Sequence, residues 1–188
     1  WNSFAYDPET DTVFVGTGNG YPWNRRVRSA DQGDNLFLCS VLALDGKTGA
    51  YRWHYQINPG DTWDYNASMD LQLAELVIDG KPRKLVSTAA RNGYFYTLDR
   101  VTGKHLVTSK YGSTTNWALS QRPTGEIDPN PGKEATIPGS LVSPVEGGVT
   151  NWPPPAYSED TGLFYVQEHN GFNLLYLTDP DPRGSMGL

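Results

Sequence analysis

The sequence predicts an all-β protein, and three observations support this fold class. Glycine and proline contribute 20 and 14 of the 188 residues, together about 18% where roughly 12% is usual. Six tryptophans and 11 tyrosines add bulky side chains that favour strands. Short β-rich runs bounded by turn signals recur along the chain, and two internal repeats connect them. We therefore expect many short strands and no convincing helix.

The expected strands lie between Asn-Gly, Asp-Gly and Thr-Gly turns. The runs are Asp11–Gly18, Ser40–Gly49 with the following AYRWHYQI, Lys84–Ala90 with the following RNGYFYTLDRVTGKHLV, and Gly162–Gly171 with the following FNLLYLTD. Met69–Leu76 alternates leucine with polar residues at period two, so a strand is expected there as well. Residues 108–150 show little regular pattern and are rich in proline and glycine, which predicts long loops.

Two internal repeats predict the architecture. Ala43–Trp53 and Thr97–Val107 share Leu-Asp-x-x-Thr-Gly at an interval of 54 residues. Ala5–Val15 aligns without gaps with Ala156–Val166, 151 residues later, which is close to three units of about 50 residues. Four-stranded blades of this period stack around an axis, because one blade cannot bury both faces of its sheet. The sequence therefore predicts a partial β-propeller over residues 1–188, with about three to four blades.

Composition excludes several classes of function. The net charge is −6, from 15 Lys plus Arg against 21 Asp plus Glu, so no basic surface suits nucleic acid. No apolar run approaches the roughly 20 residues that span a bilayer. The single Cys39 forms no internal disulfide, and the three histidines lack zinc-site spacing. The chain opens on Trp1 without a signal peptide, which is expected of a processed product or a fragment.

Five motifs resemble those of the quinoprotein alcohol dehydrogenases. Ala-x-Asp-x-x-Thr-Gly-x-x-x-Trp at 43–53 is similar to their tryptophan-docking motif. Four further segments resemble theirs in the same order and at similar spacing: Gly16–Asn24, Pro59–Tyr65, Arg91–Arg100 and Asn151–Ser158. The resemblance covers nearly the whole chain. It implies a central slice of an eight-bladed propeller that carries pyrroloquinoline quinone (PQQ) and a metal ion.

The stretch GDTWDYNAS at 60–68 places Asp64 between Trp63 and Tyr65. From these residues alone, an aspartate that caps a turn is the ordinary interpretation. The resemblance implies instead that Asp64 is the catalytic base, which takes the hydroxyl proton of the alcohol, and also a metal ligand. A divalent ion would keep the carboxylate charged, and aromatic walls would exclude water. Trp63 either lines the substrate pocket or belongs to the core.

The resemblance implies roles for four residues around the cofactor. Asn19 supplies an amide oxygen to the metal, with an ordinary Asn-Gly turn as the alternative. Trp1 stacks on the quinone ring, where blade packing is the alternative. Arg91 lies beside the quinone carbonyls as a cation, a position where many relatives have lysine. Asn151 hydrogen-bonds the cofactor, unless it is a simple loop residue.

The choice of metal follows from Asn66, two residues after Asp64. The lanthanide-dependent relatives have a second aspartate at this position, so the neutral Asn66 favours calcium. The resemblance places the glutamate ligand of the family upstream of this chain.

The function that the resemblance implies is the oxidation of a small alcohol by hydride transfer to PQQ. Calcium would act as Lewis acid, and the electrons would pass to cytochrome c or a similar acceptor in the periplasm. The remaining blades of the parent chain would be required, so the isolated fragment is expected to be inactive. Two alternatives stay open: a non-catalytic PQQ-like propeller that serves as a scaffold, and a family member with a degraded site.

Overall fold

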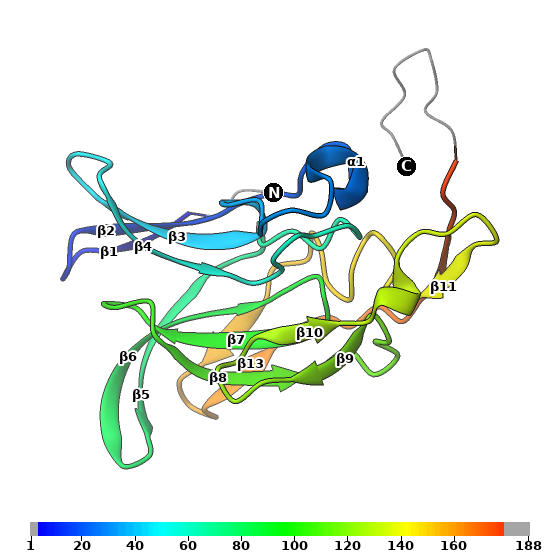
Figure 1. The fold of residues 1–188 in the computed structure, drawn as a ribbon. Coiled ribbons are helices and arrows are strands. Elements are labelled where there is room, and N and C mark those ends of the chain that lie inside the picture. Colours follow the sequence, from blue (N-terminus) through cyan, green and yellow to red (C-terminus); the bar gives the residue numbers. More distant parts are fainter. Residues whose placement is uncertain (1–3, 179–188) are drawn as a thin grey trace.

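The computed structural model describes residues 4–178, which form an almost entirely β structure (Figure 1). Two four-stranded antiparallel sheets each follow the order of the chain. The first contains β1 (Phe4–Asp7), β2 (Thr12–Gly16), β3 (Ser40–Asp45) and β4 (Tyr51–Gln56). The second contains β5 (Gln72–Ile78), β6 (Lys81–Ala89), β7 (Tyr94–Asp99) and β8 (His105–Lys110). Each sheet is a four-stranded meander, which is the form of a propeller blade, and the predicted fold class is confirmed.

A third blade begins near the end of the described chain. β12 (Ala156–Ser158) and β13 (Leu163–Tyr165) form an antiparallel hairpin in which Ala156 pairs with Tyr165. This register repeats that of the first blade, in which Ala5 pairs with Phe14. The interval of 151 residues therefore contains two complete blades and a long excursion at residues 111–155. The interval is close to three units of about 50 residues in length, but within it the structure forms two four-stranded sheets followed by the short two-stranded elements of the excursion.

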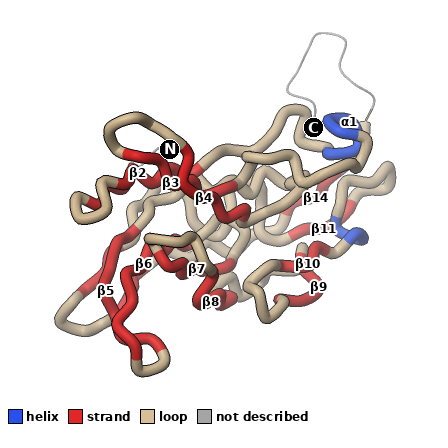
Figure 2. The backbone as a smooth tube through the Cα atoms, turned by 60° about the vertical axis from the view of Figure 1, so that its left-hand side comes forward, coloured by secondary structure: helices blue, strands red, loops and turns tan. Residues whose placement is uncertain are grey.

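The excursion contains short elements within the long loops that the sequence predicts. β9 (Ala118–Gln121) pairs with β10 (Ile127–Pro129), and the 3-10 helix η1 (Pro131–Lys133) follows. β11 (Ser140–Val142) pairs with β14 (Asn173–Leu175), which comes after the third blade's hairpin. Figure 2 shows these four strands gathered on the side of the molecule away from the β5–β6 hairpin. Through the pairing of β11 with β14, the excursion contacts the segment that follows the β12–β13 hairpin.

One short helix, α1 (Arg25–Ser29), was not expected from the sequence. It has no apolar periodicity and no buried residue, so the usual pattern signal is missing. The Asn24 side chain accepts a hydrogen bond from the backbone N–H of Arg26 at 2.9 Å, and the helix ends at Ala30 with φ 52°. Arg25 also forms an ion pair with the buried Glu134 of the excursion at 2.7 Å.

No helix within residues 4–178 has the length and apolar character needed to cross a bilayer.

The 54-residue repeat forms the joint between the two blades. In each copy the aspartate accepts hydrogen bonds from the backbone N–H and the hydroxyl of the threonine three residues later, at 2.8–2.9 Å. The indole of Trp53 from the first copy lies against Gly103 of the second, where a Cβ atom would come within 2.6 Å of the ring. The interpretation of Trp53 as a structural residue is consistent with this packing, because only a glycine admits the ring so closely.

Replacing Gly103 by alanine is expected to destabilise the protein by about 1–3 kcal/mol more than replacing Gly49. Both glycines have a positive φ, of 72° and 69°, so both variants carry the same backbone strain. A Cβ at Gly49 meets nothing within 4 Å, whereas one at Gly103 collides with the Trp53 indole. Urea unfolding of the two variants measures the difference. Equal losses of stability would contradict the docking contact.

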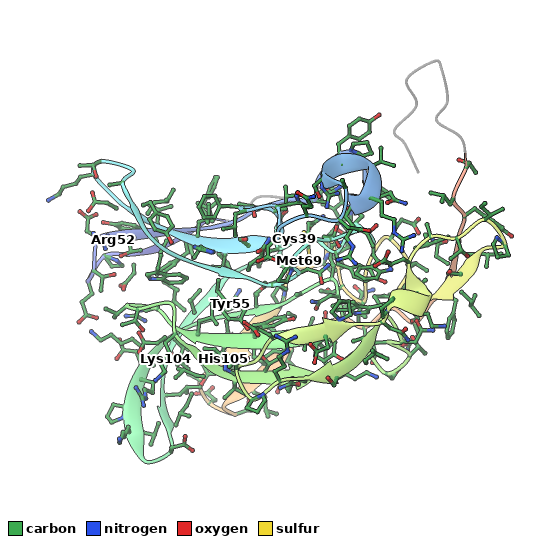
Figure 3. All side chains as sticks on the ribbon, viewed as in Figure 1. Cys39, Arg52, Tyr55, Met69, Lys104 and His105 are labelled. Carbon is green, nitrogen blue, oxygen red and sulfur yellow. The ribbon has the colours of Figure 1, made fainter. Side chains whose placement is uncertain are left out.

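Side chains fill the space between the two blades, as Figure 3 shows around Tyr55 and His105. These two rings are stacked, with centroids 6.2 Å apart and an interplanar angle of 22°. Elsewhere in the interface the buried Arg100 of the second blade binds two acidic side chains of the first blade, Asp7 at 2.9 Å and Glu9 at 3.4 Å. These contacts fix the two blades relative to each other, and with them the loops that leave the blades.

Candidate functional site

The predicted site residues lie in loops that leave the blades at one end. Asn19 follows β2, Asp64 follows β4, and Arg91 follows β6. Because alternate strands of a meander run in the same direction, these three loops emerge together. Asn151 lies at the end of the excursion, just before β12. Trp1 lies outside the described residues, so its stacking role stays a prediction.

The structure brings Asp64 and Arg91 together from successive blades. Arg91 Nη2 lies 3.4 Å from Asp64 Oδ2, and the two side chains are 4% and 13% exposed. The guanidinium also donates a hydrogen bond to the backbone carbonyl of Glu146. Its Nε atom is buried without a partner among the described residues. One donor of a buried cation is therefore available beside the Asp64 carboxylate.

The surroundings of Asp64 raise the pKa of its carboxyl group towards neutral pH. Burial raises the pKa of the Asp64 carboxyl to about 6, against the opposing effect of the Arg91 charge. The neighbouring Asp61 raises this pKa further. A carboxyl group with such a pKa exchanges a proton readily near pH 7, as a general base must.

The two rings that flank Asp64 in the sequence turn away from it into the core. Trp63 and Tyr65 stack on each other, with centroids 6.0 Å apart and an interplanar angle of 15°. Both pack against Trp117, and all three are at most 4% exposed. Asp64 itself has φ 65°, a left-handed conformation that leaves its carboxylate facing Arg91. Trp63 is therefore a core residue.

The loop of Asn19 is joined to the loop of Asp64 through the backbone. The N–H of Ala67 donates to the carbonyl of Thr17 at 2.9 Å. Gly16 permits this approach, because a Cβ there would lie 2.0 Å from the Ala67 carbonyl oxygen. Among the described residues, however, the side chains of Asn19 and Asp64 form no direct hydrogen bond.

The amide oxygen of Asn19 is available for a ligand. Its Nδ2 donates to the Gly20 carbonyl at 3.4 Å, while Oδ1 accepts no hydrogen bond from residues 4–178. The equivalent residue of the 151-residue repeat, Asn170, differs in this respect. Its Oδ1 accepts hydrogen bonds from the hydroxyls of Ser113 at 2.9 Å and Thr114 at 3.2 Å. Asn170 therefore has a structural role that Asn19 lacks.

Asn151 belongs to a segment that packs on Arg91. The N–H of Val149 donates to the Arg91 carbonyl at 2.9 Å, and a Cβ at Gly148 would lie 2.6 Å from Arg91 Cβ. Asn151 lines a pocket of about 270 Å³ in this segment. Its Oδ1 is buried without a hydrogen-bond partner among the described residues. An unpaired buried amide oxygen is costly unless a ligand satisfies it.

The oxygen atoms present at the site are ligands of the type that a hard cation prefers. The Asp64 carboxylate and the Asn19 amide supply oxygens. Asn66 instead donates from Nδ2 to Asp64 Oδ1 at 3.5 Å, and its Oδ1 accepts the N–H of Ser68 at 3.3 Å. Within residues 4–178, no three His, Cys, Asp or Glu side chains gather into a metal site. A cation bound here would therefore need further oxygens from a cofactor or from other residues.

Two residues around the site, Asp61 and Arg28, were not identified from the sequence. Asp61 is 1% exposed and accepts the backbone N–H of Asp64 at 3.1 Å. Arg28 donates to the carbonyl of Asp61 at 2.6 Å. Asp61 could have been identified as a turn residue. Its carboxylate accepts the backbone N–H groups two and three residues later, as those of Asp45 and Asp99 do. No local pattern identifies Arg28, whose contact with the site is made to Asp61, 33 residues later.

The sequence of the chain is similar to a known family and to curated proteins. The family described as "Glucose/ethanol/alcohol dehydrogenase, beta-propeller domain", under the name PQQ, matches residues 1–116. The quinohemoprotein alcohol dehydrogenase ADH IIB of Pseudomonas putida is 47% identical over 167 residues, which cover 88% of this chain and 24% of that protein. The chain thus spans about a quarter of the length of this relative.

Solved structures show the same fold. That of ADHIIG from Pseudomonas putida HK5 superposes with a TM-score of 0.89 at 40% identity, over 97% of this chain and 27% of that one. A europium-containing methanol dehydrogenase superposes with a TM-score of 0.83 at 33% identity, over 89% of this chain and 29% of that one. The chain therefore belongs to the PQQ family of glucose, ethanol and alcohol dehydrogenases, as part of their β-propeller domain.

Proposed function

We propose that these residues form part of a full-length PQQ-dependent dehydrogenase that oxidises a small alcohol. The observation that carries the proposal is the Asp64–Arg91 pair, in which a partly buried carboxylate with a pKa of about 6 lies against a buried guanidinium. Relatives that share 38–47% identity with the chain are named alcohol dehydrogenases, which supports the substrate class. The full-length protein is the object of this proposal and of the experiments below.

Asp64 acts as the base. Its carboxylate accepts the hydroxyl proton of the alcohol as the hydride leaves the carbon. A base is most effective when its pKa lies near the working pH, and burial moves Asp64 in that direction. When bound, PQQ supplies the two-electron acceptor to which the hydride passes. Asp64 holds the proton on its Oδ atoms until it is released to solvent.

Arg91 and Asn151 fit the polar edge of the cofactor. Arg91 Nε and Asn151 Oδ1 are buried polar atoms without partners among the described residues. The Arg91 guanidinium suits carbonyl or carboxylate oxygens, to which it donates in a fixed planar geometry. Asn151 presents either its oxygen or its NH₂ group, depending on the rotation of the amide. Trp1 is proposed to stack on the ring system.

Calcium is the proposed metal, bound by Asp64 and Asn19 and acting as a Lewis acid. One charged and one neutral oxygen match a divalent hard ion, and the neutral Asn66 adds no charge that would favour a trivalent one. A europium-containing relative exists, so titrating the metal-free protein with calcium and with a lanthanide tests this choice. Tighter binding of the lanthanide at equal pH would contradict it.

The electron acceptor is proposed to be cytochrome c or a similar carrier, and the location the periplasm. Several relatives are named quinohemoproteins, which indicates that those proteins combine a quinone with haem. For this protein the acceptor and the compartment are what the resemblance to the family implies.

Reconstitution tests the proposed function. Full-length protein that has been freed of cofactor and metal is incubated with PQQ and calcium. We expect a quinone absorbance band in the protein fraction and dye-linked oxidation of a primary alcohol. The controls omit PQQ or calcium, and each should lack activity. A protein that binds neither group would instead be a propeller scaffold, and one that binds both without turnover would have a degraded site.

A further inference from the structure

The side chain of Asp61 is a buried carboxylate surrounded by hydrogen-bond donors. Its Oδ1 accepts the N–H groups of Trp63 at 3.3 Å and Tyr65 at 3.1 Å, and its Oδ2 accepts that of Asp64 at 3.1 Å. Asn58 Nδ2 donates to Oδ1 at 2.5 Å. Among the described residues Asp61 has no ion-pair partner. A buried charge without a counter-ion is tolerated only where such donors replace water.

These bonds determine the conformation of residue 64. Three consecutive backbone N–H groups converge on one carboxylate, which curls the chain into an anion-binding turn. Asp64 takes φ 65° within this turn, a conformation that costs a non-glycine residue roughly 1–2 kcal/mol. The residues before and after Asp64, Trp63 and Tyr65, stack on each other in the core. The carboxylate of Asp61 thus compensates for the strain that directs Asp64 towards Arg91.

The backbone of Asp61 ties the same turn to the segment that follows Asn19. Arg28 Nη2 donates to the Asp61 carbonyl at 2.6 Å. Arg28 Nη1 donates to the carbonyls of Pro22 at 2.8 Å and Trp23 at 2.9 Å. One guanidinium therefore links the turn of Asp64 with the chain three and four residues beyond Asn19. The backbone of Asp61 is therefore hydrogen-bonded, through Arg28, to the segment that follows Asn19.

We propose that Asp61 is a positioning residue, which holds the backbone of residues 63–65 so that the Asp64 carboxylate stays beside Arg91. It touches neither substrate nor cofactor and acts through Asp64. The inference rests on the proposed function for its catalytic consequence, but not for the hydrogen bonds themselves.

The variant Asp61→Asn tests this role, because it changes one oxygen to an NH₂ group. The remaining oxygen can take the place of Oδ1 and keep its three donors, while the NH₂ group then faces the N–H of Asp64 and repels it. We expect kcat for alcohol oxidation to fall about 100-fold, since small misplacements of reacting groups have effects of this size. KM should stay within about twofold, since the substrate and cofactor contacts are not altered.

Hydrogen exchange gives a readout that does not depend on activity. Amides of residues 63–65 should exchange faster in Asp61→Asn, while those of β6 and β7 stay protected. Asp99→Asn is the matched control, because Asp99 accepts the N–H groups of Val101 and Thr102 in a remote turn. It should alter neither kcat nor exchange at 63–65. Faster exchange with unchanged kcat, or unchanged exchange, would overturn the proposal.

A second variant covers the case in which Asp61→Asn does not fold. Asn58→Ser removes the Nδ2 donor from Asp61 Oδ1 without touching Asp64. We expect a smaller fall in kcat than in Asp61→Asn, an unchanged KM, and faster exchange of the amides of residues 63–65. Wild-type values of kcat and of exchange would overturn the proposal.

If wild-type protein shows no alcohol oxidation at all, the proposed function fails. The exchange experiment then still tests the positioning of residue 64.

Discussion

Replacing Asp64 by asparagine is expected to reduce kcat for alcohol oxidation about 1,000-fold in the full-length protein, within the usual range for loss of a general base. Asparagine has nearly the same shape but cannot accept the hydroxyl proton. It also removes the negative charge that lies 3.4 Å from Arg91. Steady-state kinetics of the PQQ- and calcium-loaded variant measure the loss. A kcat within about tenfold of wild type would exclude Asp64 as the base.

A stability measurement shows that such a loss does not come from unfolding. In the folded state burial raises the pKa of Asp64 to about 6, above the ordinary value near 3.8. The folded state therefore binds this proton more tightly than the unfolded state does. As the pH rises from about 4 through 6, Asp64 loses the proton and the free energy of unfolding decreases. Metal-free Asp64→Asn should melt no lower than wild type at pH 7. The difference should vanish below about pH 4, and a lower melting temperature at pH 7 would contradict the raised pKa.

Replacing Gly16 by alanine is expected to destabilise the protein by about 3 kcal/mol, the upper range for forcing an added methyl group into packed structure. The new Cβ would lie 2.0 Å from the backbone carbonyl oxygen of Ala67, which cannot move aside as a flexible side chain can. Relief of this collision separates the loop of Asn19 from the loop of Asp64. Calcium affinity should therefore fall about 10–100-fold, as when the supports of metal ligands are removed.

Gly18→Ala is the matched control for this variant. Gly18 lies two residues further along the same loop, and a Cβ there meets nothing within 4 Å. Its stability should stay within about 0.5 kcal/mol of wild type, with unchanged calcium affinity. Calorimetric titration and chemical unfolding compare the two variants. If Gly16→Ala and Gly18→Ala behave alike, the close approach at Ala67 does not support the site.

Most of the fold could be predicted from the sequence because its signals are local or periodic. The Leu-Asp-x-x-Thr-Gly repeats at Asp45 and Asp99 occupy equivalent turns, and each aspartate binds its threonine as the spacing suggests. The segments that the 151-residue repeat aligns, Ala5–Val15 and Ala156–Val166, form hairpins with the same register, β1 with β2 and β12 with β13. Helix α1 and the pairing of β11 with β14 were not predicted, because they depend on contacts between distant segments.

The candidate site was predictable only in part. The resemblance of short motifs identified Asp64 and Arg91, which are 27 residues apart and meet because two blades stack. Local sequence shows the two aromatic neighbours of Asp64 but not that their rings point into the core. Asp61 could have been recognised by its spacing to the following amides, whereas Arg28 could not. Its four acceptors, on Pro22, Trp23, Asn35 and Asp61, converge only in the folded chain.

A crystal structure of the full-length protein with PQQ and calcium is the most direct measurement of the central claim, that the loops of Asp64 and Asn19 converge on one cation. We expect a single calcium ion with an Asp64 carboxylate oxygen and Asn19 Oδ1 both at about 2.3–2.6 Å, and with Arg91 beside the quinone. A calcium ion bound elsewhere, or side chains of Asp64 and Asn19 that both lie beyond about 4 Å from it, would contradict the account.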